Sequence, residues 1–173
     1  MPKKIAKSTL HLGDAVRSKR QELGLTQQDL ADATGFSRGH IATIERKSGN
    51  LRLSSLDRLA SVLHLDVVDL VRSAGEKQQK VSSQEAAVRA ACHIFRLRAG
   101  IGLSQERLSE AAGFFRTYVT ELELLVSVPA VGNLEPIATI LGVSVADLLM
   151  PVPQREYDSR LARRSSRVVA GGE

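Results

Sequence analysis

The chain has 173 residues, of which 43% are hydrophobic and only 3% aromatic, and it contains no tryptophan. This composition predicts small helical cores of aliphatic side chains and excludes a chain that is disordered throughout. The single cysteine, Cys92, excludes an intramolecular disulfide or a multi-cysteine zinc site, and we expect it to be a small buried residue. No apolar run approaches the ~18 residues of a membrane-spanning helix, and no apolar core follows the first lysines. We therefore expect a soluble protein without a signal peptide, metal or cofactor.

The net charge of +5 is unevenly distributed along the chain. Residues 1–81 carry 14 Lys/Arg against 9 Asp/Glu, whereas residues 82–150 carry 5 against 7 and residues 151–173 carry 5 against 3. A positive surface attracts phosphate polymers, so a basic front half favours nucleic acid as a partner of that half.

The sequence repeats itself at an offset of 78 residues, because residues 14–72 align with residues 92–150 without a gap. Identical pairs in this register include Arg20/Arg98, Leu30/Leu108, Gly35/Gly113, Glu45/Glu123 and Leu63/Leu141. The duplication predicts an all-α fold of two tandem five-helix domains, at residues 8–72 and 83–150, joined by a polar linker at residues 73–82. The basic tail at residues 151–173, which contains two prolines and five arginines, is expected to be disordered.

The first copy begins with two predicted helices. The first ends at Gly24, and the second begins where Thr26 precedes Asp29 by three residues, the spacing of an N-cap with an acid near the positive end of the helix dipole. This second helix ends at the turn of Gly35. The apolar residues expected to face the core here are Leu12, Val16, Leu23, Leu30 and Ala33.

Three further helices are predicted in the same copy. Ser37 can cap a third helix that runs to Arg46, with Ile41 and Ile44 facing inward. A fourth helix begins near residues 53–54, and Asp66 caps a short fifth helix that ends around residue 72. In the second copy, Ser82 followed by Glu85 has the spacing of a capping box, so we expect the first helix of that copy to begin there.

Residues Thr26 to Arg46 form two helices joined by a tight turn, with dimensions that suit a major groove about 12 Å wide. The stretch LGLTQQDLADATGFSRGHIATIERKSGN resembles the Cro and phage-repressor (XRE) helix-turn-helix family, over residues 12–72 and more loosely over 90–150. The resemblance implies lambda-repressor-like domains and a DNA-binding transcription regulator. It also implies an ion pair between Arg20 and Glu45 that ties two helices together and recurs in the second copy.

The resemblance further implies which residues contact DNA. Gln27 matches a position that bonds phosphate and braces the recognition helix, whereas Arg38, Gly39 and Thr43 match positions that face bases. The full set is Gln27, Gln28, Ser37, Arg38, Gly39, His40, Thr43, Arg46, Lys47, Asn50 and Arg52. Independently of the family, an arginine early in a groove-lying helix can fork onto guanine, which contributes roughly 1–3 kcal/mol of discrimination. Arg38 is therefore the leading specificity residue, and the alternative is a solvated surface charge.

The second copy differs at the corresponding positions. Glu121 replaces Thr43 and would face phosphates unfavourably, which argues against DNA binding by this copy. An exposed apolar segment more often marks a protein interface than a free surface, so residues 122–131 are predicted to take part in the interface of a dimer. The residues of that segment are Leu122, Leu124, Leu125, Val126, Val128 and Val131. The alternative is that they fold back onto the next helix as ordinary core.

These observations predict a sequence-specific regulator, expected to act as a repressor, that binds operator DNA in the bacterial cytoplasm as a homodimer on two adjacent half-sites. In a variant, both copies of one chain bind DNA, and Arg116 and Thr117 also contact bases. A different class is a protein-interaction module, such as an antitoxin or anti-activator, that has kept the helix-turn-helix fold. An enzyme is not expected, because five-helix units of this size have little room for a catalytic pocket.

Overall fold

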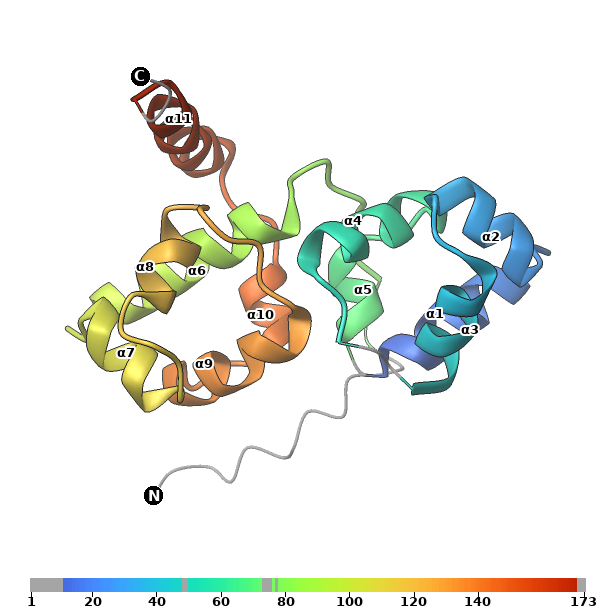
Figure 1. The fold of residues 1–173 in the computed structure, drawn as a ribbon, viewed down its shortest axis with the longest axis horizontal. Coiled ribbons are helices and arrows are strands. Elements are labelled where there is room, and N and C mark those ends of the chain that lie inside the picture. Colours follow the sequence, from blue (N-terminus) through green and yellow to red (C-terminus); the bar gives the residue numbers. More distant parts are fainter. Residues whose placement is uncertain (1–10, 48–49, 73–75, 77, 171–173) are drawn as a thin grey trace.

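The computed structural model describes residues 11–47, 50–72, 76 and 78–170, apart from the side chains of Lys47 and of residues 165–170. Its helices form two groups, with α11 packed against the second group (Figure 1). The first group contains α1 (Leu12–Glu22), α2 (Gln27–Thr34), α3 (Arg38–Lys47), α4 (Leu53–Val62) and α5 (Val67–Val71). The second contains α6 (Ala86–Gly100), α7 (Gln105–Ala111), α8 (Tyr118–Glu123), the 3-10 turn η1 (Val131–Asn133), α9 (Leu134–Leu141) and α10 (Val145–Leu149), and α11 spans Gln154–Ala170.

The described residues contain no β-strand, so the predicted all-α fold is confirmed for them. None of the helices in these residues combines the length and the apolar character needed to cross a membrane.

Side-chain caps fix the helix starts of the first group as predicted. The Thr26 hydroxyl accepts a hydrogen bond from the Asp29 N–H, and the Asp29 carboxylate accepts one from the Thr26 N–H at 2.8 Å. Ser37 Oγ accepts from the N–H of His40 at 3.1 Å in the first turn of α3, and the Asp66 carboxylate accepts from the N–H of Val68 at 3.0 Å in α5. Local polar residues therefore determine where these helices begin.

Aliphatic side chains fill the core of the first group. Leu12 and Val16 of α1, Leu30 of α2, and Ile41 of α3 are fully buried. Two predicted core residues are wrong, because Leu23 is 38% exposed and Ala33 is exposed. The buried face of α2 contains Ala31 and Thr34 beside Leu30, and Ala33 lies outside it.

The predicted start of the helix at Ser82 is also wrong, because α6 begins at Ala86. Ser82 Oγ accepts from the N–H of Gln84 and does not cap a helix. The cap comes from the first group, where the Asp57 carboxylate of α4 accepts the Ala86 N–H at 3.0 and 3.2 Å. A capping acceptor 29 residues away in the chain cannot be recognised from a local pattern.

The tail predicted to be disordered instead forms helix α11 over most of its length. Tyr157 and Arg160 are buried, and Leu161 packs partly buried against the core. The Arg160 guanidinium lies 4.8 Å from the centre of the Phe95 ring of α6 and donates to the carbonyl of Glu123 at 2.9 Å. These side chains, spaced i, i+3 and i+4, give the basic tail one face that packs on α6. Residues 171–173 lie outside the described part.

A buried ion pair joins the two groups. Arg89 of α6 donates to both carboxylate oxygens of Asp66 at 2.7 and 3.1 Å, and both side chains are almost completely buried. Arg89 also donates to the carbonyl of Leu149 at 3.0 Å. The segment around Arg52 pairs in antiparallel fashion with the segment around Ala130.

The segment predicted to dimerise is therefore occupied within the chain, which corrects the expectation of an exposed apolar surface. Leu122, Leu125 and Val131 are buried, and Leu124 and Val128 are partly buried. The N–H of Val131 donates to the carbonyl of Leu51 at 2.7 Å. Of the six predicted residues only Val126, at 62%, is largely exposed.

Candidate nucleic-acid interface

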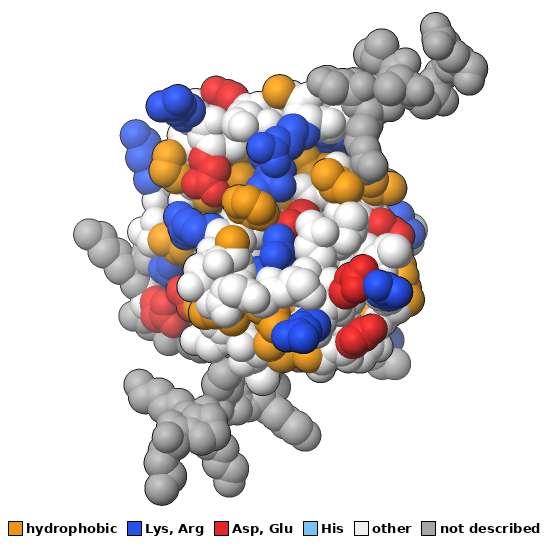
Figure 2. Space-filling model, turned by 90° about the vertical axis from the view of Figure 1, so that its left-hand side faces the viewer, with side chains coloured by type: hydrophobic (Ala, Val, Ile, Leu, Met, Phe, Trp, Pro, Cys, Tyr) orange, Lys and Arg blue, Asp and Glu red, His pale blue; other side chains and the backbone are white. Residues whose placement is uncertain are grey.

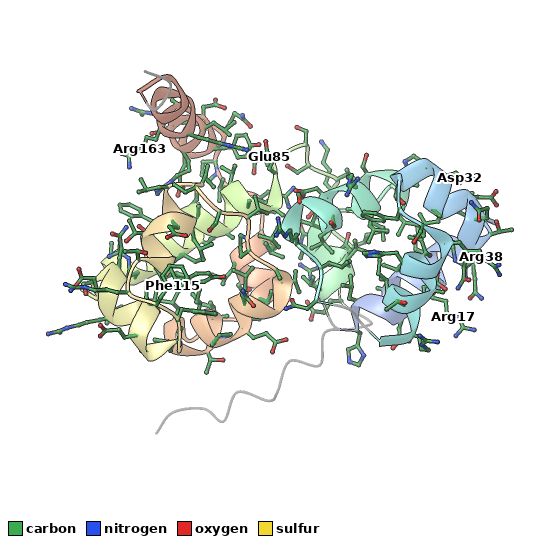
Figure 3. The ribbon with its side chains drawn as sticks, in the orientation of Figure 1. Arg17, Asp32, Arg38, Glu85, Phe115 and Arg163 are labelled. Atoms are coloured by element: carbon green, nitrogen blue, oxygen red, sulfur yellow. The ribbon has the colours of Figure 1, made fainter. Side chains whose placement is uncertain are left out.

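Helix α3 has one buried and one exposed face. Ile41 and Ile44 are buried, whereas Arg38, Gly39, His40, Thr43 and Arg46 are all exposed. The sticks of Arg38 lie at the end of the molecule farthest from α6–α10 (Figure 3). The residues predicted to face DNA bases therefore lie together on an open surface formed by α2 and α3.

A polar cluster beneath this surface holds α1, α2 and α3 together. Arg20 of α1 donates to the two carboxylate oxygens of Glu45 in α3 at 2.6 and 3.1 Å, and Gln27 at the start of α2 donates to the same carboxylate at 3.0 Å. Burial alone would raise the pKa of Glu45, but the hydrogen bonds from Arg20 and Gln27, with the charges of Arg20 and Arg17, outweigh it and lower that pKa. The ion pair that the resemblance implied is present, and Gln27 does brace α3.

Arg38 lines a shallow depression together with Arg20, Thr26, Gln27 and Gln28. Within the described residues the structure records no ion pair for Arg38. Its neighbour Gln28 is neutral and donates to Asp32 at 2.7 Å, so the guanidinium of Arg38 is available to a ligand. An arginine at this place can offer two parallel donors to an anion or to a guanine edge.

The remaining residues of the first turns of α3 form local contacts. His40 stacks on Phe36 with ring centroids 5.0 Å apart, and Thr43 Oγ1 donates to the carbonyl of Gly39 at 2.9 Å. A Cβ built on Gly39 meets nothing within 4 Å, so the glycine leaves open space above the helix. Ser37 serves as the helix cap described above.

Of the residues predicted to contact DNA, two lie away from this surface, and the side chain of a third lies outside the described part of the structure. Asn50 Oδ1 accepts the N–H of Gly132 at 2.8 Å, so this side chain belongs to the junction between the two groups. Arg52 is exposed but pairs through its backbone with Ala130 at the same junction. Lys47 ends α3, and its side chain lies outside the described residues.

Sequence reasoning missed Arg17, which is exposed on α1. Its charge acts on Glu45, and Figure 3 shows it at the same end of the molecule as Arg38. The signal was present, because Arg17 precedes Arg20 by three residues and therefore lies on the same side of α1. Together with Arg38 and Arg46, it places three exposed guanidiniums around α3.

The surface at the opposite end of the molecule has a different chemistry. Arg116 is paired with Glu106 at 2.7 Å, and Glu121 accepts from Thr117 at 3.1 Å. Phe115, which stands 78 residues after Ser37, is 58% exposed and gives α8 no side-chain cap. Figure 2 shows basic, acidic and hydrophobic side chains interspersed over this end. The arginine that corresponds to Arg38 is thus paired at this end of the molecule.

Comparison with known proteins places this site in a family. The helix-turn-helix family matches residues 16–70, which span α2 and α3 and most of the other helices of the first group. Control protein C.SmaI from Serratia marcescens is 38% identical over 69 residues, which make up 40% of this chain and 82% of that protein. No solved structure matches the chain significantly. The chain therefore belongs to the helix-turn-helix (XRE) family and is a DNA-binding transcription regulator.

Proposed function

We propose that the chain binds a specific operator by placing α3 in the major groove, and that it acts there as a repressor. The observation that carries this proposal is Arg38, an exposed arginine at the start of α3 without a recorded ion pair among the described residues. Arg17 and Arg46 flank it and would meet phosphates on either side of the groove. The name of the relative, a control protein, supports a regulatory role.

We further propose that residues 83–150 form a second copy of the helix-turn-helix domain at residues 8–72, joined to it by a linker at residues 73–82. The polar cluster under α3 has a counterpart under α8, which supports this assignment. Arg98 donates to the Glu123 carboxylate at 2.8 and 3.0 Å, and Gln105 donates to the same carboxylate at 2.7 Å. Such a cluster orients three helices in the same way in both halves.

The two copies have unequal roles in this proposal, because Arg38 has no ion pair among the described residues, whereas its counterpart Arg116 is paired. In the second copy, Glu106 stands where the first has Gln28 and neutralises Arg116. The partly exposed Glu121 brings a further negative charge to α8. The α3 surface therefore provides most of the specificity.

The proposal can be tested by selecting bound sites from random duplex DNA and measuring affinity for the selected sequence by fluorescence anisotropy. Arg38→Ala should weaken specific binding by roughly 5- to 150-fold, because one bidentate guanine contact contributes about 1–3 kcal/mol. Arg155→Ala, which removes an exposed arginine from α11, is the matched control and should change affinity less than about twofold. Equal effects of the two substitutions would refute a reading role for α3.

A protein-interaction module is the second candidate function, and the exposed Phe115 and Val126 side chains favour it. Salt separates the two candidates, because a protein that neutralises several phosphates loses DNA affinity steeply as salt rises. Binding to random duplex DNA that is undetectable even at low salt would favour the module. Neither candidate assigns a catalytic activity to the chain.

A further inference from the structure

Two contacts between the two groups of helices join residues that are 78 positions apart, which is the offset of the sequence repeat. The antiparallel bridge pairs Arg52 with Ala130. Farther along the chain, Arg72 donates to the sulfur of Met150 at 3.6 Å. In both pairs, one residue contacts its own counterpart in the other half. An antiparallel contact between corresponding residues, repeated at a second place, is the pattern that a twofold rotation between two copies produces.

The hydrogen bonds beside the bridge obey the same symmetry. The N–H of Leu53 donates to the carbonyl of Pro129 at 2.9 Å, and the N–H of Val131 donates to the carbonyl of Leu51 at 2.7 Å. Exchanging each residue for its counterpart 78 positions away converts the first bond into the second. This part of the junction is therefore isologous, with the same surface used by both halves. The Arg89–Asp66 ion pair lies outside this symmetry, because the exchanged positions hold His11 and Ser144.

The arrangement of the helices shows this rotation directly. In Figure 1, α5 and α10 lie in contact near the centre, and a half-turn in the plane of the picture brings α2 to the place of α7 and α4 to that of α9. The same half-turn brings α3 to the place of α8. The helices thus have the approximate symmetry of a dimer within one polypeptide, apart from the additional helix α11 and the Arg89–Asp66 ion pair.

We propose, on the basis of the DNA-binding function proposed above, that one chain by itself spans an operator of two half-sites, with α3 on one half-site and α8 on the other. A duplex has a local twofold axis perpendicular to its own axis, so two units related by a half-turn can dock on neighbouring major grooves when the axes coincide. The second unit takes the place of a second subunit, and the surface that would join two chains is already filled at the Arg52–Ala130 bridge.

The two half-sites are unequal in this arrangement. Helix α3 has ten residues and an uncompensated Arg38, whereas α8 has six residues and the Arg116–Glu106 pair. We therefore expect α3 to make the base-specific contacts of the first half-site, and α8 to make weaker contacts with the second. The operator should be an imperfect palindrome in which base changes in the α3 half-site cost more than those in the α8 half-site.

The first test is the stoichiometry and footprint of the full chain on the selected operator. Light scattering of the complex with a duplex of about 30 base pairs should give one chain per duplex, and hydroxyl-radical footprinting should protect two regions about 10 base pairs apart on one face. Two chains per duplex, or protection of a single groove, would overturn the inference.

The second test is a gain of affinity. Glu121→Thr restores in α8 the residue type of Thr43 and removes a carboxylate from the proposed DNA surface, so affinity for the operator should rise roughly two- to fivefold. Asp158→Asn removes an exposed carboxylate from α11 and should leave affinity unchanged. Equal affinities of the two variants would refute DNA contact by α8. If Arg38→Ala weakens binding while Glu121→Thr does not strengthen it, the proposed function stands and this inference is refuted. If the chain shows no specific binding at all, both are refuted.

Discussion

The carboxylate of Asp57 caps α6 across the junction, and replacing it by the neutral amide of asparagine should stabilise the protein at neutral pH. In the Asp57→Asn variant the amide oxygen remains as an acceptor for the Ala86 N–H, so the cap is kept while the charge is removed. Burial raises the pKa of Asp57 to about 6, against the opposing effects of the Ala86 N–H and the Arg89 charge. Ionisation of Asp57 therefore lowers the free energy of unfolding of the folded chain.

The expected pH dependence follows from the two protonation equilibria. In the unfolded chain Asp57 releases its proton near its ordinary pKa of 3.8, and in the folded chain it does so near 6. Between these values the folded state binds more protons, so this group's contribution to stability falls as the pH rises and stays constant above about 6. At about 1.4 kcal/mol for each pKa unit, the difference corresponds to about 3 kcal/mol at neutral pH.

Urea unfolding followed by circular dichroism at several pH values between about 4 and 8 measures this difference. The stability of Asp57→Asn relative to the original protein should be close to zero near pH 4 and rise by up to about 3 kcal/mol by about pH 7. Asp32→Asn, at an exposed position on α2, is the control and should show a small difference that does not vary with pH. A pH-independent difference for Asp57→Asn, or a loss of stability at about pH 8, would refute the reasoning.

Three other substitutions test the packing and the caps. Gly13→Ala places a Cβ 2.6 Å from the backbone oxygen of Ile44, so urea unfolding should show a loss of roughly 1–3 kcal/mol, and no loss would mean that α1 and α3 separate freely. Asp66→Asn leaves the buried guanidinium of Arg89 without its carboxylate and should cost about 3–5 kcal/mol in the same assay, whereas a cost below about 1 kcal/mol would argue against burial of the pair. Ser37→Ala removes the cap of α3 and should cost about 1 kcal/mol, with an unchanged melting temperature as the contrary result.

Local signals in the sequence predicted much of the first group of helices. Thr26 with Asp29, Ser37 and Asp66 all act as the caps that their positions indicated. His64, which stands 78 residues before Gly142, follows α4 with a left-handed φ of 53°. Each of these caps depends on residues a few positions apart, which is the range over which a single sequence is informative.

The features that the sequence did not predict depend on distant partners. The start of α6 depends on Asp57, and the order of α11 depends on its packing against Phe95. Gly13 carried no warning either, because the corresponding residue of the second copy is Ala91 and the close approach of α1 to α3 is not visible in the pattern. At the candidate site, the basic surface of α3 was predicted, whereas the role of Asn50 at the junction required the position of Gly132.

The symmetric junction also bears on how a gene would respond to the amount of this protein. A regulator that must first pair with another molecule occupies its operator in proportion to the square of a low concentration, which produces a threshold. In the arrangement proposed above both halves are joined in one polypeptide, so occupancy would rise with the first power of concentration and the response would be graded from the first molecules made.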